Sequence, residues 1–122
     1  MEEAYLKKRA VQIAGALKKL LPRAKITLHY SNNWELLTAV ILSAQCRDSK
    51  VNEITSVLFK KYPKLDDYVK AEPADFEKDI KSAGFYRQKA KNILAAAKII
   101  KNKYHGNIPK TMKEMLTLPG VA

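Results

Sequence analysis

Hydrophobic residues in this chain recur at intervals of three and four, the spacing of one face of a helix. The densest apolar stretch covers residues 34–44, where the only polar side chains are Glu35, Thr38 and Ser43. A helix there is apolar around most of its circumference, so the pattern predicts a buried central helix. The polar run at residues 31–33 supplies side chains that cap the start of such a helix.

Amphipathic patterns lie on both sides of this central stretch. Residues 3–21 and 86–104 each combine an apolar stripe with a face rich in lysine and arginine, as surface helices packed on a core do. Shorter helices are predicted at residues 48–62, 65–69, 73–80 and 111–116. Asp48 is an N-cap signal for the first of these, and Thr111 with Glu114 forms a capping box for the last. No stretch alternates with a period of two, so the predicted fold class is all-α.

Charge and composition limit the kinds of partner that this chain can have. The 122 residues amount to about one domain, and the net charge of +11 favours a polyanionic partner, nucleic acid before membrane. A lysine-rich surface that merely keeps the protein soluble fits the charge equally well. One cysteine excludes an internal disulfide and an all-cysteine metal site built from this chain, and we expect no metal site. The apolar runs are far too short to span a bilayer and no signal peptide is recognisable, so we expect no membrane association and an intracellular location.

Three turns carry the candidate chemistry. The central helix ends in Gln45, Cys46 and Arg47, a tight turn that can present a rigid probe at the surface. A second turn, at residues 82–84, precedes Phe85, and the chain closes on Leu-Pro-Gly-Val at residues 118–121. A glycine hairpin of that kind lets backbone N–H groups approach a DNA phosphate, but alone it is more often an ordinary turn.

Four blocks in this order and spacing closely resemble the endonuclease III family of DNA glycosylases. They are L-L-T-A-V-I-L-S-A-Q-C-x-D, G-F-Y-R-Q-K-A-x-N-I, G-x-I-P and L-P-G-V. The resemblance implies the helical DNA-glycosylase fold of the helix-hairpin-helix superfamily, truncated within the hairpin, so that only an N-terminal portion is present. It implies base excision repair: flipping an oxidised pyrimidine out of duplex DNA, cutting its glycosidic bond and nicking the strand as an AP lyase.

The resemblance also assigns roles to residues. In the family, a Gln and an apolar residue from two interhelical turns fill the hole left by the flipped base, and the matching positions are Gln45 and Phe85. Without the resemblance, Gln45 could simply cap the central helix and Phe85 could belong to the core. The complete set of implied DNA contacts is Gln45, Arg47, Phe85, Arg87, Lys89, Pro119, Gly120 and Val121.

Two positions depart from the family pattern. Arg47 stands where many relatives carry Thr, and Ala122 stands at the second glycine of the hairpin. Residues 38–44 contain no carboxylate, which argues against the related adenine glycosylases, whose catalytic Glu lies in the central helix.

The catalytic groups of the family are expected beyond Ala122. The family's Schiff-base lysine lies just after the hairpin and its catalytic aspartate further on, so this chain alone is expected to be inactive. Cysteines that hold a [4Fe-4S] cluster in the family come later still, so no cofactor is expected in this chain. In the family the helix at residues 1–21 packs on the part that follows the hairpin, and residues 22–122 form a partial helical barrel. The apolar stripe of 1–21 then predicts self-association or binding to a missing C-terminal half.

Three function classes remain open at this point. The first is part of an endonuclease III-like glycosylase that binds double-stranded DNA with a damaged base or abasic site. The second is a non-enzymatic duplex-DNA-binding helical module, which would show steep salt dependence without a covalent intermediate. The third is an RNA- or ribosome-associated basic protein, which would prefer single strands or RNA.

Overall fold

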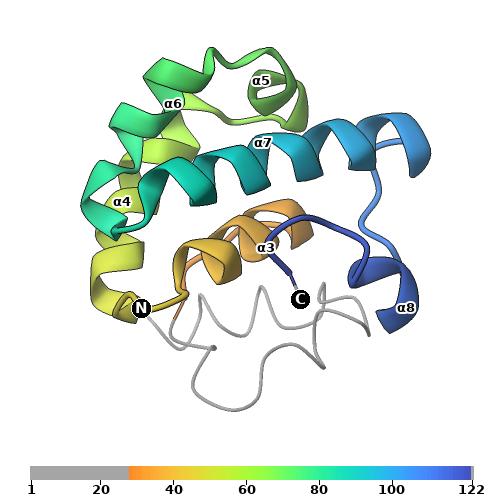
Figure 1. Cartoon of the computed structure of the whole chain (residues 1–122), viewed down its shortest axis with the longest axis horizontal. Helices are drawn as coiled ribbons and strands as arrows, with labels where there is room; N and C mark the ends of the chain where they lie inside the picture. The colour runs from red at the N-terminus through yellow and green to blue at the C-terminus, as the bar shows by residue number, and fades with distance from the viewer. Residues whose placement is uncertain (1–27, 122) are drawn as a thin grey trace.

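The computed structural model describes residues 28–121, and every regular element in that range is a helix (Figure 1). The elements are α3 (Asn33–Leu42), α4 (Asp48–Lys61), α5 (Leu65–Lys70), α6 (Pro73–Asp79), the 3-10 helix η2 (Lys81–Ala83), α7 (Tyr86–Lys103) and α8 (Met112–Met115). The all-α prediction is confirmed, with bounds close to the predicted ones. The predictions for residues 1–21 and for Ala122 lie outside the described residues.

Helix α3 lies at the centre of the fold, as predicted. Its apolar side chains are buried almost all round, and it contacts both α4 and α7. The predicted cap is present: the Glu35 N–H donates to Asn32 Oδ1 at 2.8 Å, and the Ser31 N–H donates to Glu35 Oε1 at 2.6 Å. These bonds satisfy donors at the helix start and hold the Glu35 carboxylate at the edge of the core.

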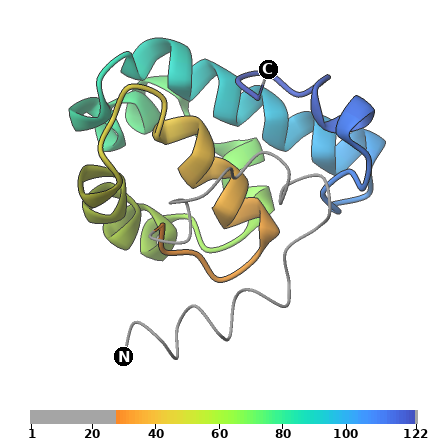
Figure 2. The same ribbon diagram turned by 90° about the horizontal axis from the view of Figure 1, so that it is seen from below.

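Helix α7 organises the remaining elements around α3. In Figure 1 it crosses the middle of the molecule with α5 and α6 on one side and α3 on the other, and Figure 2 shows α3 and α7 side by side from below. Its predicted apolar stripe is buried, with Ala90, Ile93, Ala97 and Ile100 at one per cent exposure or less. Helix α7 is therefore held by its buried face, which packs against α3, α5 and α6.

An aromatic cluster joins α3 to the helices on the far side of α7. The ring of Tyr68 lies 5.0 Å from that of Trp34 and 5.8 Å from that of Phe76, both edge to face. Tyr62, at the end of α4, contacts the rings of Tyr68 and Phe76, and its hydroxyl donates to Asp79 Oδ2 at 2.7 Å. The cluster forms the part of the core where the end of α4 meets α5 and α6.

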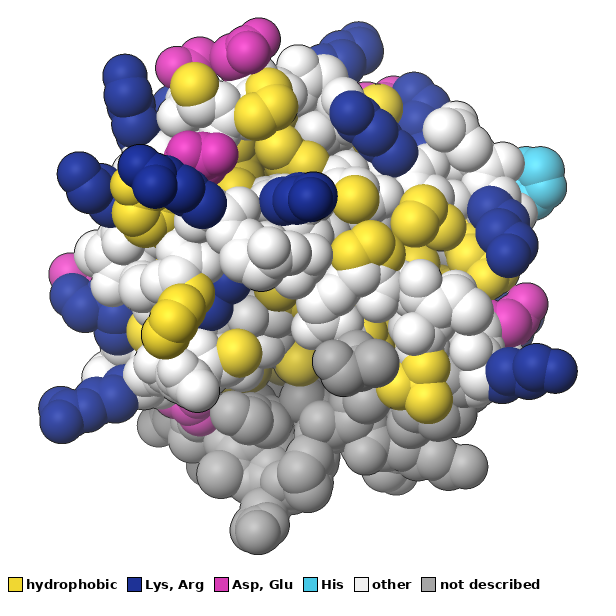
Figure 3. All heavy atoms as spheres, viewed as in Figure 1, with side chains coloured by type: hydrophobic (Ala, Val, Ile, Leu, Met, Phe, Trp, Pro, Cys, Tyr) yellow, Lys and Arg dark blue, Asp and Glu magenta, His cyan; other side chains and the backbone are white. Residues whose placement is uncertain are grey.

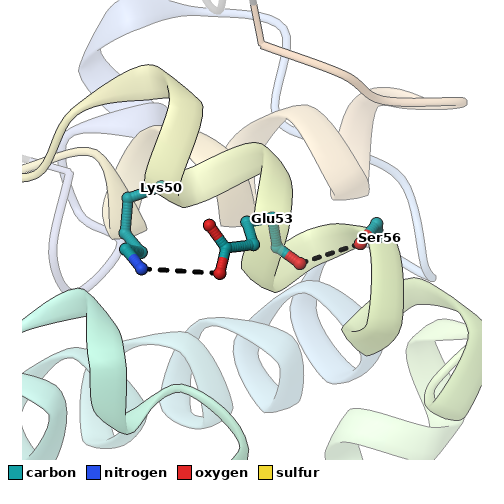
Figure 4. Close-up of polar contacts among 3 residues, drawn as sticks. All are labelled: Lys50, Glu53 and Ser56. Atoms are coloured by element: carbon teal, nitrogen blue, oxygen red, sulfur yellow. Dashed lines mark hydrogen bonds and ion pairs between the residues drawn. The ribbon is translucent and has the colours of Figure 1, made fainter.

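Helix α4 begins at Asp48, the residue predicted to cap it. Arg47 occupies the N-cap position, so the prediction that Asp48 caps this helix is wrong; Asp48 is its first helical residue. The outer face of α4 is polar (Figure 4): Lys50 Nζ lies 3.5 Å from Glu53 Oε1, and the Ser56 hydroxyl donates to the Glu53 carbonyl at 2.8 Å. Exposed contacts of this kind contribute little to stability, so α4 is held by its buried face.

The buried tyrosines predict a loss of stability at alkaline pH. Burial raises the pKa of Tyr68, and burial together with the bond to Asp79 raises that of Tyr62, well above the ordinary value. The unfolded chain therefore loses these protons first, so their stabilisation is complete below about pH 10 and decreases above it. Urea unfolding from about pH 8 to about pH 11 should show Tyr68→Phe losing about 1.4 kcal/mol less per pH unit than the parent above pH 10. Equal slopes would contradict this account.

Candidate nucleic-acid interface

Gln45 and Phe85 stand on exposed turns in left-handed backbone conformation. Their φ angles are 52° and 48°, and within residues 28–121 His105 is the one other non-glycine residue with positive φ. This conformation costs a non-glycine residue about 1–2 kcal/mol, so the surrounding packing must impose it. Phe85 is 69% exposed, so the alternative that it belongs to the core is wrong. Ser43, and not Gln45, caps α3.

The two turns lie at the same end of the α3–α7 pair (Figures 1 and 2). Gln45 follows the C-terminal end of α3, and Phe85 is the N-cap residue of α7. Residues that are far apart in the sequence are thus presented together at one edge of the molecule. This arrangement suits insertion of both side chains into a single opening in a base stack.

Lys89 does not lie on the exposed basic face where the sequence placed it. Its side chain is buried at 5% exposure, and its Nζ donates to the Leu42 carbonyl at 2.8 Å and to the Ala83 carbonyl at 3.1 Å. Carbonyls at helix ends lack intrahelical partners, and here a lysine from α7 supplies the donor. Desolvation lowers the pKa of Lys89. A direct contact between this ammonium and DNA is not available in this structure.

The arginines predicted to contact DNA are both exposed and flank the two turns. Arg47 is at the N-cap of α4, and Arg87 is in the first turn of α7, with its guanidinium 5.5 Å from the Tyr86 ring centroid. Arg87 also lines a groove between α6 and α7 together with Lys91 and Lys98. Figure 3 shows Lys and Arg side chains over the upper part and both sides of the face in view, with fewer acidic side chains between them.

The terminal turn is packed against the middle of α7. One half of the predicted capping box is present at α8, where the Glu114 N–H donates to Thr111 Oγ1 at 3.2 Å; the Glu114 carboxylate accepts from the Thr111 hydroxyl at 3.0 Å. The Val121 N–H donates to the Leu118 carbonyl at 3.3 Å, which closes the turn around Pro119 and Gly120. Gly120 has φ 83°, and a Cβ there would lie 2.9 Å from Asn92 Cβ. This close approach is the structural reason for the glycine.

Neither a metal site nor a membrane span is present in the part of the chain that the structure describes. No cluster of His, Cys, Asp and Glu in residues 28–121 could hold a metal ion. Within the same range, no helix has both the length and the apolar character needed to cross a bilayer.

Residues 38–118 match the HhH-GPD superfamily of base excision DNA repair proteins. The chain belongs to this superfamily. It is 46% identical to endonuclease III of Synechocystis sp. over 98% of its own length and 54% of that relative, and 45% identical to endonuclease III of Bacillus subtilis over 90% and 52%. The chain thus spans about half the length of these relatives.

Solved structures of the HhH-GPD superfamily share the fold. A trapped endonuclease III–DNA covalent intermediate in an estranged-adenine complex superimposes with a TM-score of 0.78 at 38% identity, covering 98% of this chain and 53% of that one. A non-covalent endonuclease III–DNA complex gives a TM-score of 0.78 at 42% identity, covering 87% and 50%. A thermostable thymine-DNA glycosylase gives 0.70 at 25% identity, covering 98% and 52%. The predicted resemblance and fold class are confirmed.

The matched segment of the HhH-GPD superfamily includes both turns and ends at Leu118, immediately before the glycine turn. The roles of Gln45, Phe85 and the arginines in DNA contact stay predictions. Sequence reasoning missed the bridging role of Lys89 and the left-handed backbone of the two turns. Helical periodicity gave no signal for either, because both depend on how α3 and η2 end.

Gly120→Ala is expected to destabilise the protein more than Gly106→Ala. Both glycines have nearly the same φ, 83° and 86°, but a Cβ at Gly106 meets nothing within 4 Å whereas one at Gly120 meets Asn92. Backbone strain is therefore matched, and the extra cost of overpacking against α7 should be about 1 kcal/mol or more. Urea unfolding of the two variants measures the difference. Equal losses would show that the turn does not need close contact with α7.

Proposed function

We propose that this chain supplies the duplex-opening part of an endonuclease III-like DNA glycosylase/AP lyase that acts on oxidised pyrimidines in double-stranded DNA. The observation that carries the proposal is the exposure of Gln45 and Phe85, each on a left-handed turn at the same end of the α3–α7 pair. Family membership and similarity to two endonuclease III–DNA complexes support the choice of duplex DNA. An intracellular location follows from such a substrate.

Opening a duplex requires a replacement for the lost base pair. Unstacking a base costs a few kcal/mol, which inserted side chains can offset. A phenyl ring stacks on neighbouring bases, and a side-chain amide both donates to and accepts from the unpaired base. Because the turns are already fixed, little ordering entropy is lost on binding. Phe85 and Gln45 therefore act as a preformed wedge.

The positive residues around the wedge orient the duplex. Arg47 and Arg87 are exposed beside the two turns and can contact phosphates on either side of the opened base. The turn at Pro119, Gly120 and Val121 offers backbone to a further phosphate, since glycine permits close approach. These contacts carry no sequence information, which suits an enzyme that reads damage.

The chemistry itself is assigned to residues outside this chain. A Schiff-base lysine must reach the sugar C1′ with a lowered pKa. Desolvation lowers the pKa of Lys89, but this lysine is buried and bonded to two carbonyls, so it cannot serve as this nucleophile. A [4Fe-4S] cluster requires several cysteines and does not fit a chain that has only Cys46. Association through residues 1–21, with a second copy or a C-terminal half, belongs to the same proposal.

Removal of the wedge should abolish the preference for damage while leaving general DNA binding intact. For the double variant Gln45→Ala/Phe85→Ala, we expect affinity for an abasic-site duplex to decrease about tenfold or more, because stacking contributes about 1–3 kcal/mol per base. Affinity for undamaged duplex should change little. Val57→Ala is the control, since Val57 is an apolar residue of similar exposure, 67%, on α4. Fluorescence anisotropy with both duplexes measures this, and equal losses on both would contradict the wedge.

Borohydride trapping separates the binding part from the chemistry. With an abasic-site duplex, this chain is expected to bind without forming a trapped covalent complex, because the family's Schiff-base lysine is expected beyond Ala122. A lesion-dependent trapped complex would place the nucleophile within these 122 residues. Binding that prefers RNA or single strands would instead overturn the choice of duplex DNA.

A further inference from the structure

Lys89 forms hydrogen bonds to the ends of two different helices. Its Nζ reaches the carbonyl of Leu42, the last residue of α3, at 2.8 Å and the carbonyl of Ala83, the last residue of η2, at 3.1 Å. Gln45 follows the first of these residues closely in the chain, and Phe85 follows the second. One ammonium thus connects the two helix ends from which the Gln45 turn and the Phe85 turn begin.

The left-handed turns create the need for this donor. In a continuing helix the Leu42 carbonyl would accept from the Cys46 N–H, but that N–H donates to the Ser43 carbonyl at 3.1 Å instead. After Ala83, Gly84 leaves the helical conformation with φ 78° and ψ 152°. The changes of direction that expose Gln45 and Phe85 therefore leave carbonyls without intrahelical partners, and Lys89 satisfies one at each turn.

Filling this space with a charged group has a high cost in free energy. Burying an ammonium costs free energy that an apolar side chain of similar size would not, and the lowered pKa of Lys89 reflects that cost. The ammonium nevertheless offers three donors from a single point, which an apolar residue cannot replace. Retaining a buried charge here makes sense if the link between the turns is needed.

We propose that Lys89 is a positioning residue that locks the Gln45 turn to the Phe85 turn, so that both side chains enter the duplex as one rigid wedge. The link itself concerns only this chain, whereas its effect on DNA rests on the proposed function. Lys89 is one helical turn beyond Phe85 on α7 and nearly one turn before Asn92, which seats the terminal turn. It therefore also holds the wedge in register with that turn.

The test compares Lys89→Met with Lys103→Met. Methionine keeps much of the side-chain length and removes every donor, and Lys103 is an exposed lysine at the far end of the same helix, so both variants lose one positive charge. Lys89→Arg is the conservative variant, because a guanidinium can donate to both carbonyls. Far-UV circular dichroism establishes that each variant is folded. Should Lys89→Met not fold, Lys89→Gln takes its place in every measurement.

The first readout needs no DNA. Cys46, the only cysteine, is half-buried beside Gln45, so its rate of reaction with a thiol reagent, compared at an alkaline pH where the thiol is ionised in every variant, reports opening of that turn and not the loss of the nearby Lys89 charge. We expect about a tenfold or larger increase in Lys89→Met, no change in Lys103→Met and partial recovery in Lys89→Arg. An unchanged rate in folded Lys89→Met would overturn the link.

The second readout follows base opening. With 2-aminopurine placed opposite an abasic site, its fluorescence increases as the base is unstacked. Lys89→Met should lose most of this increase and most of the preference for the abasic duplex, while its affinity for undamaged duplex matches that of Lys103→Met. If the thiol rate increases but base opening matches Lys103→Met, the positioning role is wrong. If the parent itself shows no preference for the abasic duplex, the proposed function fails, and the thiol rate still decides the link.

Discussion

The packing of α7 against α3 is the constraint on which the rest of this structure depends. The buried stripe of α7 fixes that helix beside a central helix that is apolar almost all round. Each wedge turn continues directly from one end of this pair. Neither turn could keep its left-handed residue if the helices were free to shift, because the strain of about 1–2 kcal/mol would be relieved by local rearrangement.

The candidate site combines rigidity with exposure. Phe85 is a large apolar residue that is exposed to solvent and held in a strained backbone conformation, which fits the DNA contact proposed for it. The polar groups left by the turns are satisfied from inside the protein, so both wedge side chains stay directed outward. Under the proposed function, such preorganisation would let binding free energy be used for opening the duplex.

Periodicity predicted the helices well because burial of one face is a local property of the sequence. The caps at Asn32 and Thr111 were also readable, since each bond spans only a few residues. The wedge residues came from resemblance, not from pattern. Lys89 was misplaced because helical spacing cannot show that two distant carbonyls lack partners, and the cap of α4 was misplaced because Arg47 already provides the extended backbone there. The contacts of Lys89 depend on the tertiary fold, which helical spacing does not show.

The close contact between Gly120 and Asn92 limits how the length of this chain can change during evolution. The segment of α7 from Phe85 to Asn92 sets the spacing between the wedge and the terminal turn. Each residue of a helix advances about 1.5 Å along the axis and rotates about 100° around it. Inserting or deleting one residue here would therefore rotate Asn92 away from Gly120. The length of this segment therefore cannot change by single residues, even where an individual side chain can vary.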